Sequence, residues 1–134
     1  MLRYCYGMRI IRTVIVTLGL LAGTIAAATP ADASTASCPM YEGLLSQYSP
    51  GWSVARMSHL AGRESGCQPA AWNRRGHASG LLQITPANYG LCSTALGMSV
   101  NRWTLQDPDT NIRCAAAMYS YWSNARRSGY RPWQ

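Results

Sequence analysis

The sequence predicts a mainly helical domain of the α+β class, with a short loop or ribbon beside its second helix and two disulfides. Apolar residues recur at helical spacing in three segments of the chain. Between the second and the third segment, glycine and proline interrupt helix and strand alike. Four cysteines follow residue 33, and an even number in a short exported chain indicates two disulfides. The 134 residues suffice for one domain.

Residues 1–33 have the features of a secretory signal peptide. Arginines precede an uncharged apolar run over residues 13–28, which is shorter than the ~20 residues that a membrane span needs. Residues 31–33 form an A-x-A cleavage site, residues 26–28 form a second one, and Met8 is an alternative start. We therefore expect a secreted or cell-wall-associated protein whose domain covers residues 34–134, with no stable membrane anchor after cleavage.

The charge of the chain favours an anionic partner. All twelve basic residues are arginines and the formal net charge is +7. The arginines are scattered and no nucleic-acid-binding motif occurs, so we expect no nucleic-acid partner. The cysteines and the two histidines match no metal-site spacing, and we expect no metal, no cofactor and a monomer. Beyond residue 33 the acidic residues are Glu42, Glu64, Asp107 and Asp109.

The first helix follows Pro39, which a first helical turn tolerates. Its apolar stripe, at spacings of three, four and seven, comprises Tyr41, Leu44, Leu45 and Tyr48. Glu42 lies in the first turn, off this stripe, where it suits the helix dipole. Residues 49–51, Ser-Pro-Gly, then turn the chain.

The second helix begins at Ser53 as N-cap and places Glu64 on its apolar side. Glu64 lies at helical spacing from the residues of the apolar face, which are Val54, Met57, Leu60 and Ala61. A carboxylic acid that faces an apolar region tends to keep its proton, and a proton donor is what cleavage of a glycosidic bond requires. The alternative is an ion pair of Glu64 with Arg63, Arg74 or Arg75 that ends the helix.

A polar loop follows the second helix. Its breakers are Gly66, Pro69, Gly76 and Gly80. Between them lie Trp72, Asn73 and His77, side chains that can stack on a sugar or hydrogen-bond its hydroxyl groups. Residues 81–84 form a strand-like apolar run in which Gln83 is the polar member, either a half-exposed strand residue or an amide that faces a ligand.

The last helix runs from Pro108 to about Arg127, with Asp107 as N-cap. Residues 90–106 indicate a loop with a short helical turn. Most aromatic residues are expected in the core, and only Trp72 and Tyr89 are assigned to substrate. For the disulfides we expect Cys67–Cys92, which brackets the polar loop, and Cys38–Cys114.

The ordered motifs resemble the signature of the soluble lytic transglycosylase domain of the lysozyme-like superfamily. That signature is roughly E-S-x-x-x-P-x-A-x-[SN]-x-x-G-A-x-G-L-[ML]-Q, and its counterparts are Glu64-Ser65, Pro69, Ala71, Asn73, Gly76 and residues 80–84, Gly-Leu-Leu-Gln-Ile. The likeness continues through Asp107-Pro108 and Asn111-Ile112 to residues 129–133, Gly-Tyr-Arg-Pro-Trp. It covers about residues 54–133.

The resemblance implies a small lysozyme-like fold with a cleft beside the catalytic helix. The family's catalytic glutamate corresponds to Glu64, followed by Ser65, and its substrate-contacting glutamine to Gln83. Such enzymes act on peptidoglycan glycan strands, at the bond between N-acetylmuramic acid and N-acetylglucosamine. One glutamate serves as acid and then as base, which leaves a 1,6-anhydro-muramyl end. The shortage of other acids favours this route over a two-carboxylate hydrolase.

Two departures from the family pattern bear on the mechanism. The Gly76–Gly80 spacing is one residue longer, which leaves the correspondence of His77 open. The A-Y-N motif of larger members is absent, and Tyr89, Tyr119 or Trp133 is a candidate for the place of its tyrosine. A hydrolytic lysozyme and a non-catalytic wall-binding module are the alternative functions.

Overall fold

The structure is a computed structural model that describes residues 37–134. The expected signal peptide, its cleavage sites and the alternative start at Met8 lie outside the described residues. Within the described part, four α-helices and one two-stranded ribbon form the fold, which confirms the predicted class. No helix of this part has the length and apolarity that would let it cross a membrane.

The helices α1 (Glu42–Gln47) and α2 (Val54–Ser65) form the first helical pair. A 3-10 helix, Pro39–Tyr41, leads into α1, so the expected first helix is split into two parts. The predicted N-cap of α2 is confirmed, because the Ser53 hydroxyl accepts a hydrogen bond from the Arg56 backbone N–H. Gly66 ends α2 in the left-handed conformation, with φ of 61°.

The ribbon consists of β1 (Trp72–Asn73) and β2 (Ala78–Ser79), which pair antiparallel. The prediction of a strand over residues 81–84 is wrong. These residues form a turn after Gly80, and only Ile84 returns to form an isolated bridge with Ser79. A short apolar run is as typical of a buried turn as of a buried strand, so the composition of residues 81–84 does not distinguish the two.

Helix α3 (Tyr89–Leu96) occupies a segment that was expected to be mainly loop, and a 3-10 helix, Pro86–Asn88, precedes it. Its sequence contains glycine, serine and threonine, which are weak helix formers. Packing on α4 (Pro108–Asn124) therefore decides its conformation. Helix α4 begins as predicted, with Asp107 accepting from the Thr110 N–H, and it ends three residues earlier than expected.

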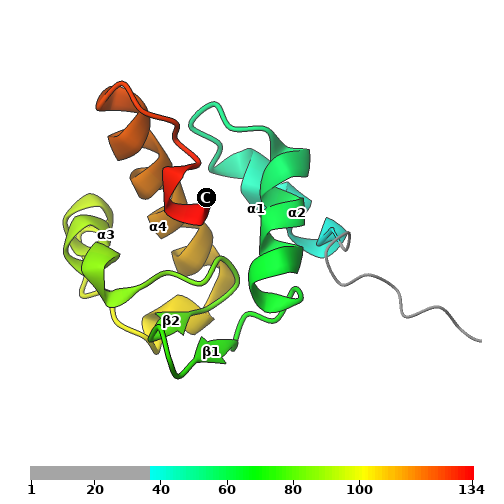
Figure 1. The fold of residues 1–134 in the computed structure, drawn as a ribbon, viewed down its shortest axis with the longest axis vertical. Helices are drawn as coiled ribbons and strands as arrows, with labels where there is room; N and C mark the ends of the chain where they lie inside the picture. The colour runs from blue at the N-terminus through cyan, green and yellow to red at the C-terminus, as the bar shows by residue number, and fades with distance from the viewer. Residues whose placement is uncertain (1–36) are drawn as a thin grey trace, which may run out of the picture. The chain divides into compact units, whose positions relative to one another are not determined.

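Helix α4 contacts both α3 and α1, and Figure 1 shows it between α3 on one side and α1 and α2 on the other. The ribbon lies at one end of this arrangement (Figure 1). A last 3-10 helix, Arg131–Trp133, packs on α4. The fully buried apolar side chains include Leu45, Met57, Leu81, Leu82, Ile84, Leu105, Ile112 and Met118.

Two disulfides are present, but the expected pairing is wrong. The bonds are Cys38–Cys67 and Cys92–Cys114, with Cα–Cα distances of 5.5 and 4.9 Å. The first joins the two ends of the α1–α2 segment, and the second joins α3 to α4. Each bond therefore closes a helical pair that is adjacent in the sequence, and none brackets the polar loop. The expected pairing ignored α3, whose packing on α4 brings Cys92 to Cys114.

Candidate active site

Glu64 lies in the last turn of α2, one residue before its end. Met57, Leu60 and Ala61 on the same face are buried, whereas the Glu64 side chain is 27% exposed. The expectation of an acid aimed at the core is therefore corrected: Glu64 stands at the border between the core and solvent. The left-handed Gly66 explains this position, because it ends the helix before another turn can cover the carboxylate.

Arg63 is the direct partner of Glu64. Its Nη2 lies 2.8 Å and its Nε 3.2 Å from Glu64 Oε1. The same Nη2 donates to the backbone carbonyl of Trp133. The ion pair that the sequence left as an alternative is thus present, with Arg63 rather than Arg74 or Arg75. Only Oε1 is engaged, so within residues 37–134 the second oxygen, Oε2, has no hydrogen-bond donor.

Gln83 holds the turn after β2 together. Its Nε2 donates to the carbonyls of Gly80, at 2.9 Å, and of Ala71, at 3.3 Å. Its backbone φ is 47°, and that of Gly80 is 79°. A Cβ atom at Gly80 would collide with the Leu105 carbonyl and with the Asn111 side chain, so glycine is required there. The amide nitrogen of Gln83 therefore serves the loop, and its Oε1 accepts no bond from the described residues.

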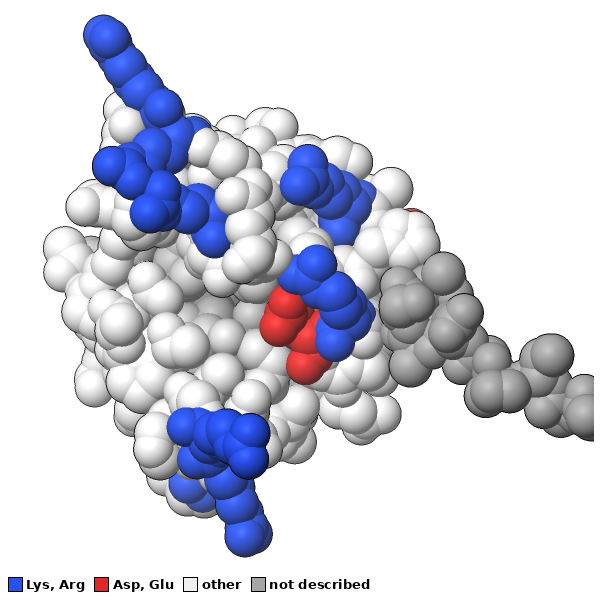
Figure 2. Space-filling view, in the orientation of Figure 1, with Lys and Arg blue, Asp and Glu red and all other residues white. Residues whose placement is uncertain are grey.

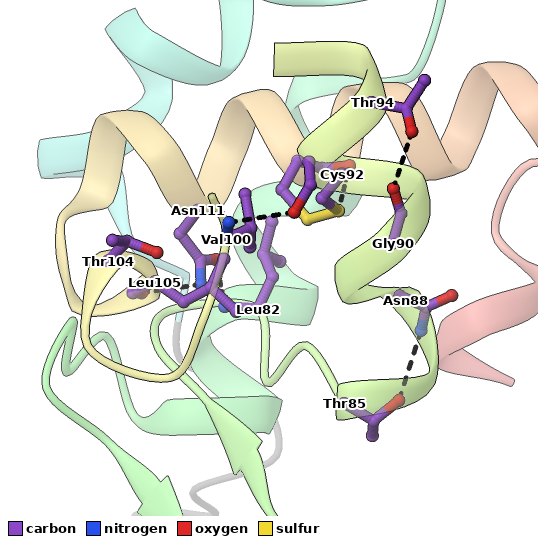
Figure 3. Close-up of a disulfide and its surroundings, with 12 residues drawn as sticks. Leu82, Thr85, Asn88, Gly90, Cys92, Thr94, Val100, Thr104, Leu105 and Asn111 are labelled. Carbon is purple, nitrogen blue, oxygen red and sulfur yellow. Dashed lines mark hydrogen bonds between the residues drawn. A yellow bond between two sulfur atoms is a disulfide. The ribbon is translucent and has the colours of Figure 1, made fainter. Parts of the chain in front are cut away.

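Asn111 fixes this turn to α4. It is fully buried; its Oδ1 accepts from the Leu82 N–H at 2.9 Å, and its Nδ2 donates to the carbonyls of Leu105, at 2.9 Å, and Ser79, at 3.2 Å. Figure 3 shows Asn111 beside Leu82 and Leu105, with Cys92 on the neighbouring helix. A single buried amide thus satisfies three backbone groups of two loops, which sets the position of Gln83.

The C-terminal segment links the turn to Glu64. The buried indole of Trp133 donates its Nε1–H to the Leu82 carbonyl at 2.9 Å, and its own carbonyl accepts from Arg63. Of the three aromatic candidates for the missing tyrosine, Trp133 is therefore linked to Glu64, through its backbone and Arg63. Tyr119 instead packs edge-on against Trp52 and Tyr130, and burial raises the pKa of its hydroxyl.

The other predicted site residues do not converge on Glu64 through hydrogen bonds. The Ser65 hydroxyl donates to the Ala61 carbonyl in its own helix. Asn73 is exposed, and its Oδ1 accepts from the Arg75 and Gly76 N–H groups, so it shapes the ribbon turn. The hydroxyl of Tyr89 is buried and has no partner among residues 37–134.

Trp72 and His77 lie together on the ribbon, with ring centroids 5.6 Å apart. Sequence reasoning missed a third member of this group, Arg102, whose guanidinium carbon lies 4.4 Å from the Trp72 ring centroid. In the sequence, an arginine next to a tryptophan in a polar loop, Arg102-Trp103, is the pattern that could have indicated this group.

One face of the molecule is mixed in charge and hollowed. Figure 2 shows acidic atoms that touch basic ones on this face, and a hollow in the uncharged surface beside them. A cavity of about 300 Å³ is lined by Arg56, His59, Leu60, Arg63, Tyr130, Trp133 and Gln134. Among the described residues, no cluster of three or more His, Cys, Asp or Glu could hold a metal ion.

A larger open groove of about 800 Å³ lies between α3 and α4. It is lined by Ala87, Asn88, Gly90, Leu91, Thr94, Ala95, Ala117, Ser120, Tyr121 and Trp122. These residues include no carboxylate and no imidazole. We therefore place the candidate site at Glu64, since carboxylates and imidazoles are the groups that most often transfer protons near neutral pH.

Comparison with known proteins gives one match. The family model described as transglycosylase SLT domain matches residues 47–129, which is more than half of the chain and includes Glu64, the ribbon and Gln83. No curated protein and no solved structure matches the chain. The matched range contains Arg63 and ends before Trp133, so one partner of the hydrogen bond between them lies outside it.

Proposed function

The chain belongs to the transglycosylase SLT domain family, and on this premise we propose that it cleaves the glycosidic bond between N-acetylmuramic acid and N-acetylglucosamine with Glu64 as its one acid and base. Membership of the family makes the chain a lysozyme-like domain whose substrate class is peptidoglycan. The assignment of Glu64, the anhydro product and export of the protein are our proposals.

The observation that carries the assignment is the distribution of the four described acids. Asp107 caps α4 and accepts from the Thr110 N–H and hydroxyl, at 2.9 and 2.7 Å. Asp109 accepts from the Tyr48 hydroxyl at 2.6 Å and pairs with Arg113 at 3.6 Å. Glu42 lies in the first turn of α1. Glu64 pairs with Arg63, which donates to the Trp133 carbonyl, and the Trp133 indole donates to Leu82 in the Gln83 turn. A single acid linked to this turn supports chemistry with one carboxylate.

The reaction then has two proton transfers at the same side chain. In the first, protonated Glu64 gives its proton to the glycosidic oxygen as the bond from that oxygen to the muramyl C1 breaks. In the second, the resulting carboxylate takes the proton of the muramyl C6 hydroxyl, whose oxygen bonds to C1 and closes the 1,6-anhydro ring. Oε2 is the oxygen suited to both proton transfers, because Arg63 donates to Oε1.

The test is incubation of the purified protein with peptidoglycan and mass spectrometry of the soluble products. We expect 1,6-anhydro-muramyl ends from the wild type and none from Glu64→Gln. Glu42→Gln, which removes an acid of the same type from α1, serves as the matched control and should leave product formation intact. Equal product from Glu64→Gln and the wild type would exclude the catalytic role of Glu64.

Two alternative functions predict different outcomes in the same assay. Reducing muramyl ends would identify a hydrolytic lysozyme, in which water replaces the C6 hydroxyl. The ion pair between Arg63 and Glu64 favours a non-catalytic wall-binding module, which would bind peptidoglycan and release nothing.

We also propose that the protein is secreted or associated with the cell wall and is monomeric. Two disulfides agree with an oxidising compartment outside the cytoplasm. Recovery of the protein from the medium or wall fraction with Ser34 as its first residue would support export and cleavage. Recovery of the intact chain from the cytoplasm would contradict both.

A further inference from the structure

An arginine side chain lies between two tryptophan rings at the ribbon end of the domain. The guanidinium carbon of Arg102 is 4.4 Å from the ring centroid of Trp72 and 3.9 Å from that of Trp103. His77 extends the row, since its ring centroid is 5.6 Å from that of Trp72. We name these four residues, Trp72, His77, Arg102 and Trp103, the stacked platform.

Trp103 is presented to solvent on a rigid loop. The residue is 64% exposed. Asn101 Oδ1 accepts from the backbone N–H groups of Trp103, at 2.9 Å, and Thr104, at 3.1 Å, while the Asn101 N–H donates to the Thr104 hydroxyl at 2.9 Å. An exposed indole on a fixed backbone loses little conformational freedom when it binds a ligand. Its flat apolar face is the kind of surface on which a sugar ring stacks.

The positive charge of Arg102 is not neutralised by the protein. Arg102 makes no ion pair within residues 37–134, and its Nε is buried without a hydrogen-bond partner there. The described acids are engaged elsewhere: Glu64 pairs with Arg63, Asp109 pairs with Arg113, and Asp107 caps α4. Stacking on aromatic faces leaves the edge of a guanidinium free to donate to carboxylate or phosphate oxygens.

The surroundings of the platform strengthen its preference for anions. Arg74 and Arg75 are exposed on the turn between β1 and β2, next in sequence to Trp72 and Asn73. Basic side chains gather at the end of the molecule where the ribbon lies (Figure 2). A positive field of this kind raises the local concentration of an acidic polymer.

The platform is joined to the candidate active site by a short path. Trp72 follows Ala71, whose carbonyl accepts from the Gly80 N–H at 2.9 Å and from Gln83 Nε2 at 3.3 Å. The residues that hold the Gln83 turn therefore also fix the start of the platform. In the proposed reaction both proton transfers belong to Glu64, so the platform is given a binding role alone.

We propose that the stacked platform is a second, non-catalytic binding site for an acidic glycan, with a sugar face on Trp103 and a neighbouring carboxylate or phosphate on Arg102. Only the choice of a wall polymer as the ligand rests on the proposed function. Two sources carry this chemistry: the carboxylates of peptide stems on peptidoglycan, and the phosphodiesters of polymers attached to it.

The experiment measures binding separately from cleavage. Every variant is made in the Glu64→Gln chain, and sedimentation with insoluble peptidoglycan sacculi gives the dissociation constant at low salt and at physiological salt. We expect Trp103→Ala and Arg102→Gln each to weaken binding at least about fivefold. Arg102→Lys retains the charge without the planar stack and should recover part of the loss. Tyr121→Ala removes another exposed aromatic, 54% exposed on α4, and should bind within about twofold of the parent chain.

Three further arms identify the ligand. Sacculi freed of phosphodiester polymers by hydrofluoric acid, and the soluble glycan strands that an amidase then releases from them, show which anion Arg102 binds, because the effect of Arg102→Gln should disappear with its source. Binding to the soluble strands is measured by titration of tryptophan fluorescence. If the effect persists on strands that carry neither anion, the role of the anion is wrong. If a single-stranded oligonucleotide competes better than soluble glycan fragments, the ligand class is wrong.

The binding proposal and the catalytic proposal can be refuted separately. Binding by Trp103→Ala and Arg102→Gln equal to that of the parent chain overturns the platform, whether or not the wild type releases anhydro products. Absence of products from the wild type, with binding that depends on Trp103, overturns the proposed reaction alone. Melting temperatures of Trp103→Ala and Tyr121→Ala should match that of the parent, since both residues are exposed, and the melting temperature of Arg102→Gln is measured as its folding control.

Discussion

Replacement of Asn111 by alanine should destabilise the domain more than any exposed asparagine replacement. Asn111 is fully buried and makes three hydrogen bonds, to the Leu82 N–H and to the carbonyls of Leu105 and Ser79. Alanine offers neither an acceptor nor a donor. The backbone groups of both loops then lose their partner inside the core.

The size of the loss in free energy of unfolding follows from which backbone groups lose their hydrogen-bond partner. The two bonds donated by Asn111 contribute about 1 kcal/mol each. The Leu82 N–H has Asn111 as its one acceptor among the described residues, and burying it unpaired costs roughly 1–3 kcal/mol. The loss in free energy of unfolding is therefore about 3–5 kcal/mol, a large part of the roughly 5–15 kcal/mol that holds a typical domain together.

Urea unfolding, followed by tryptophan fluorescence with the disulfides intact, measures this loss. Asn73→Ala is the matched control, because Asn73 also bonds to the backbone, accepting from two N–H groups, but is exposed. Its loss in free energy of unfolding should stay below about 1 kcal/mol. A loss below about 1 kcal/mol for Asn111→Ala would refute the reasoning, since three buried bonds would then contribute no more than two exposed ones.

Three shorter predictions test the same scaffold. Gly80→Ala should cost more than about 2 kcal/mol, because φ is 79° and the added Cβ meets the Leu105 carbonyl, whereas Gly90→Ala on α3 has open space and should be neutral or slightly stabilising by urea unfolding. Arg63→Ala removes the contact shared by Glu64 and the Trp133 carbonyl, so turnover of peptidoglycan should fall about tenfold, while Arg113→Ala on α4 changes it less than twofold. Hydrogen bonds from Thr110 lower the pKa of Asp107. The stability that ionised Asp107 contributes to the fold is therefore complete above the ordinary aspartate pKa and is lost as the pH falls through the lower folded value. The urea concentration at the unfolding midpoint of the wild type should fall below about pH 4, and it should depend less on pH in Asp107→Asn.

The parts of the fold that the sequence predicted are those with local physical causes. Ser53 and Asp107 cap α2 and α4 as expected, because an N-cap depends only on residues a few positions away. Helix α3 was missed, since its weak helix formers are held by α4 and by the Cys92–Cys114 bond. The disulfide pairing was wrong for the same reason, because it depends on which helices pack together.

For the candidate site, too, the sequence indicates local features and not the contacts between distant residues. Helical spacing placed Glu64 on the core side of α2, and the structure places it at the border of that face. Arg63 was one of three arginines considered, and the distance in sequence did not decide between them. The link through the Trp133 carbonyl joins residues 70 positions apart, and no local pattern predicts such a contact.

The residues of the family signature mostly form one hydrogen-bonded scaffold in this chain. Gly80 is required by the approach of Asn111, Asn111 holds the Leu82 N–H, and Gln83 uses its amide nitrogen on the carbonyls of Gly80 and Ala71. A motif of this kind specifies the position of a turn relative to α2 and α4 more than it supplies reactive groups. Glu64 is the titratable member to which we assign the proton transfers, so activity should depend on the scaffold through geometry and on Glu64 through chemistry. Loss of turnover in Asn111→Ala with retained platform binding would separate these two contributions.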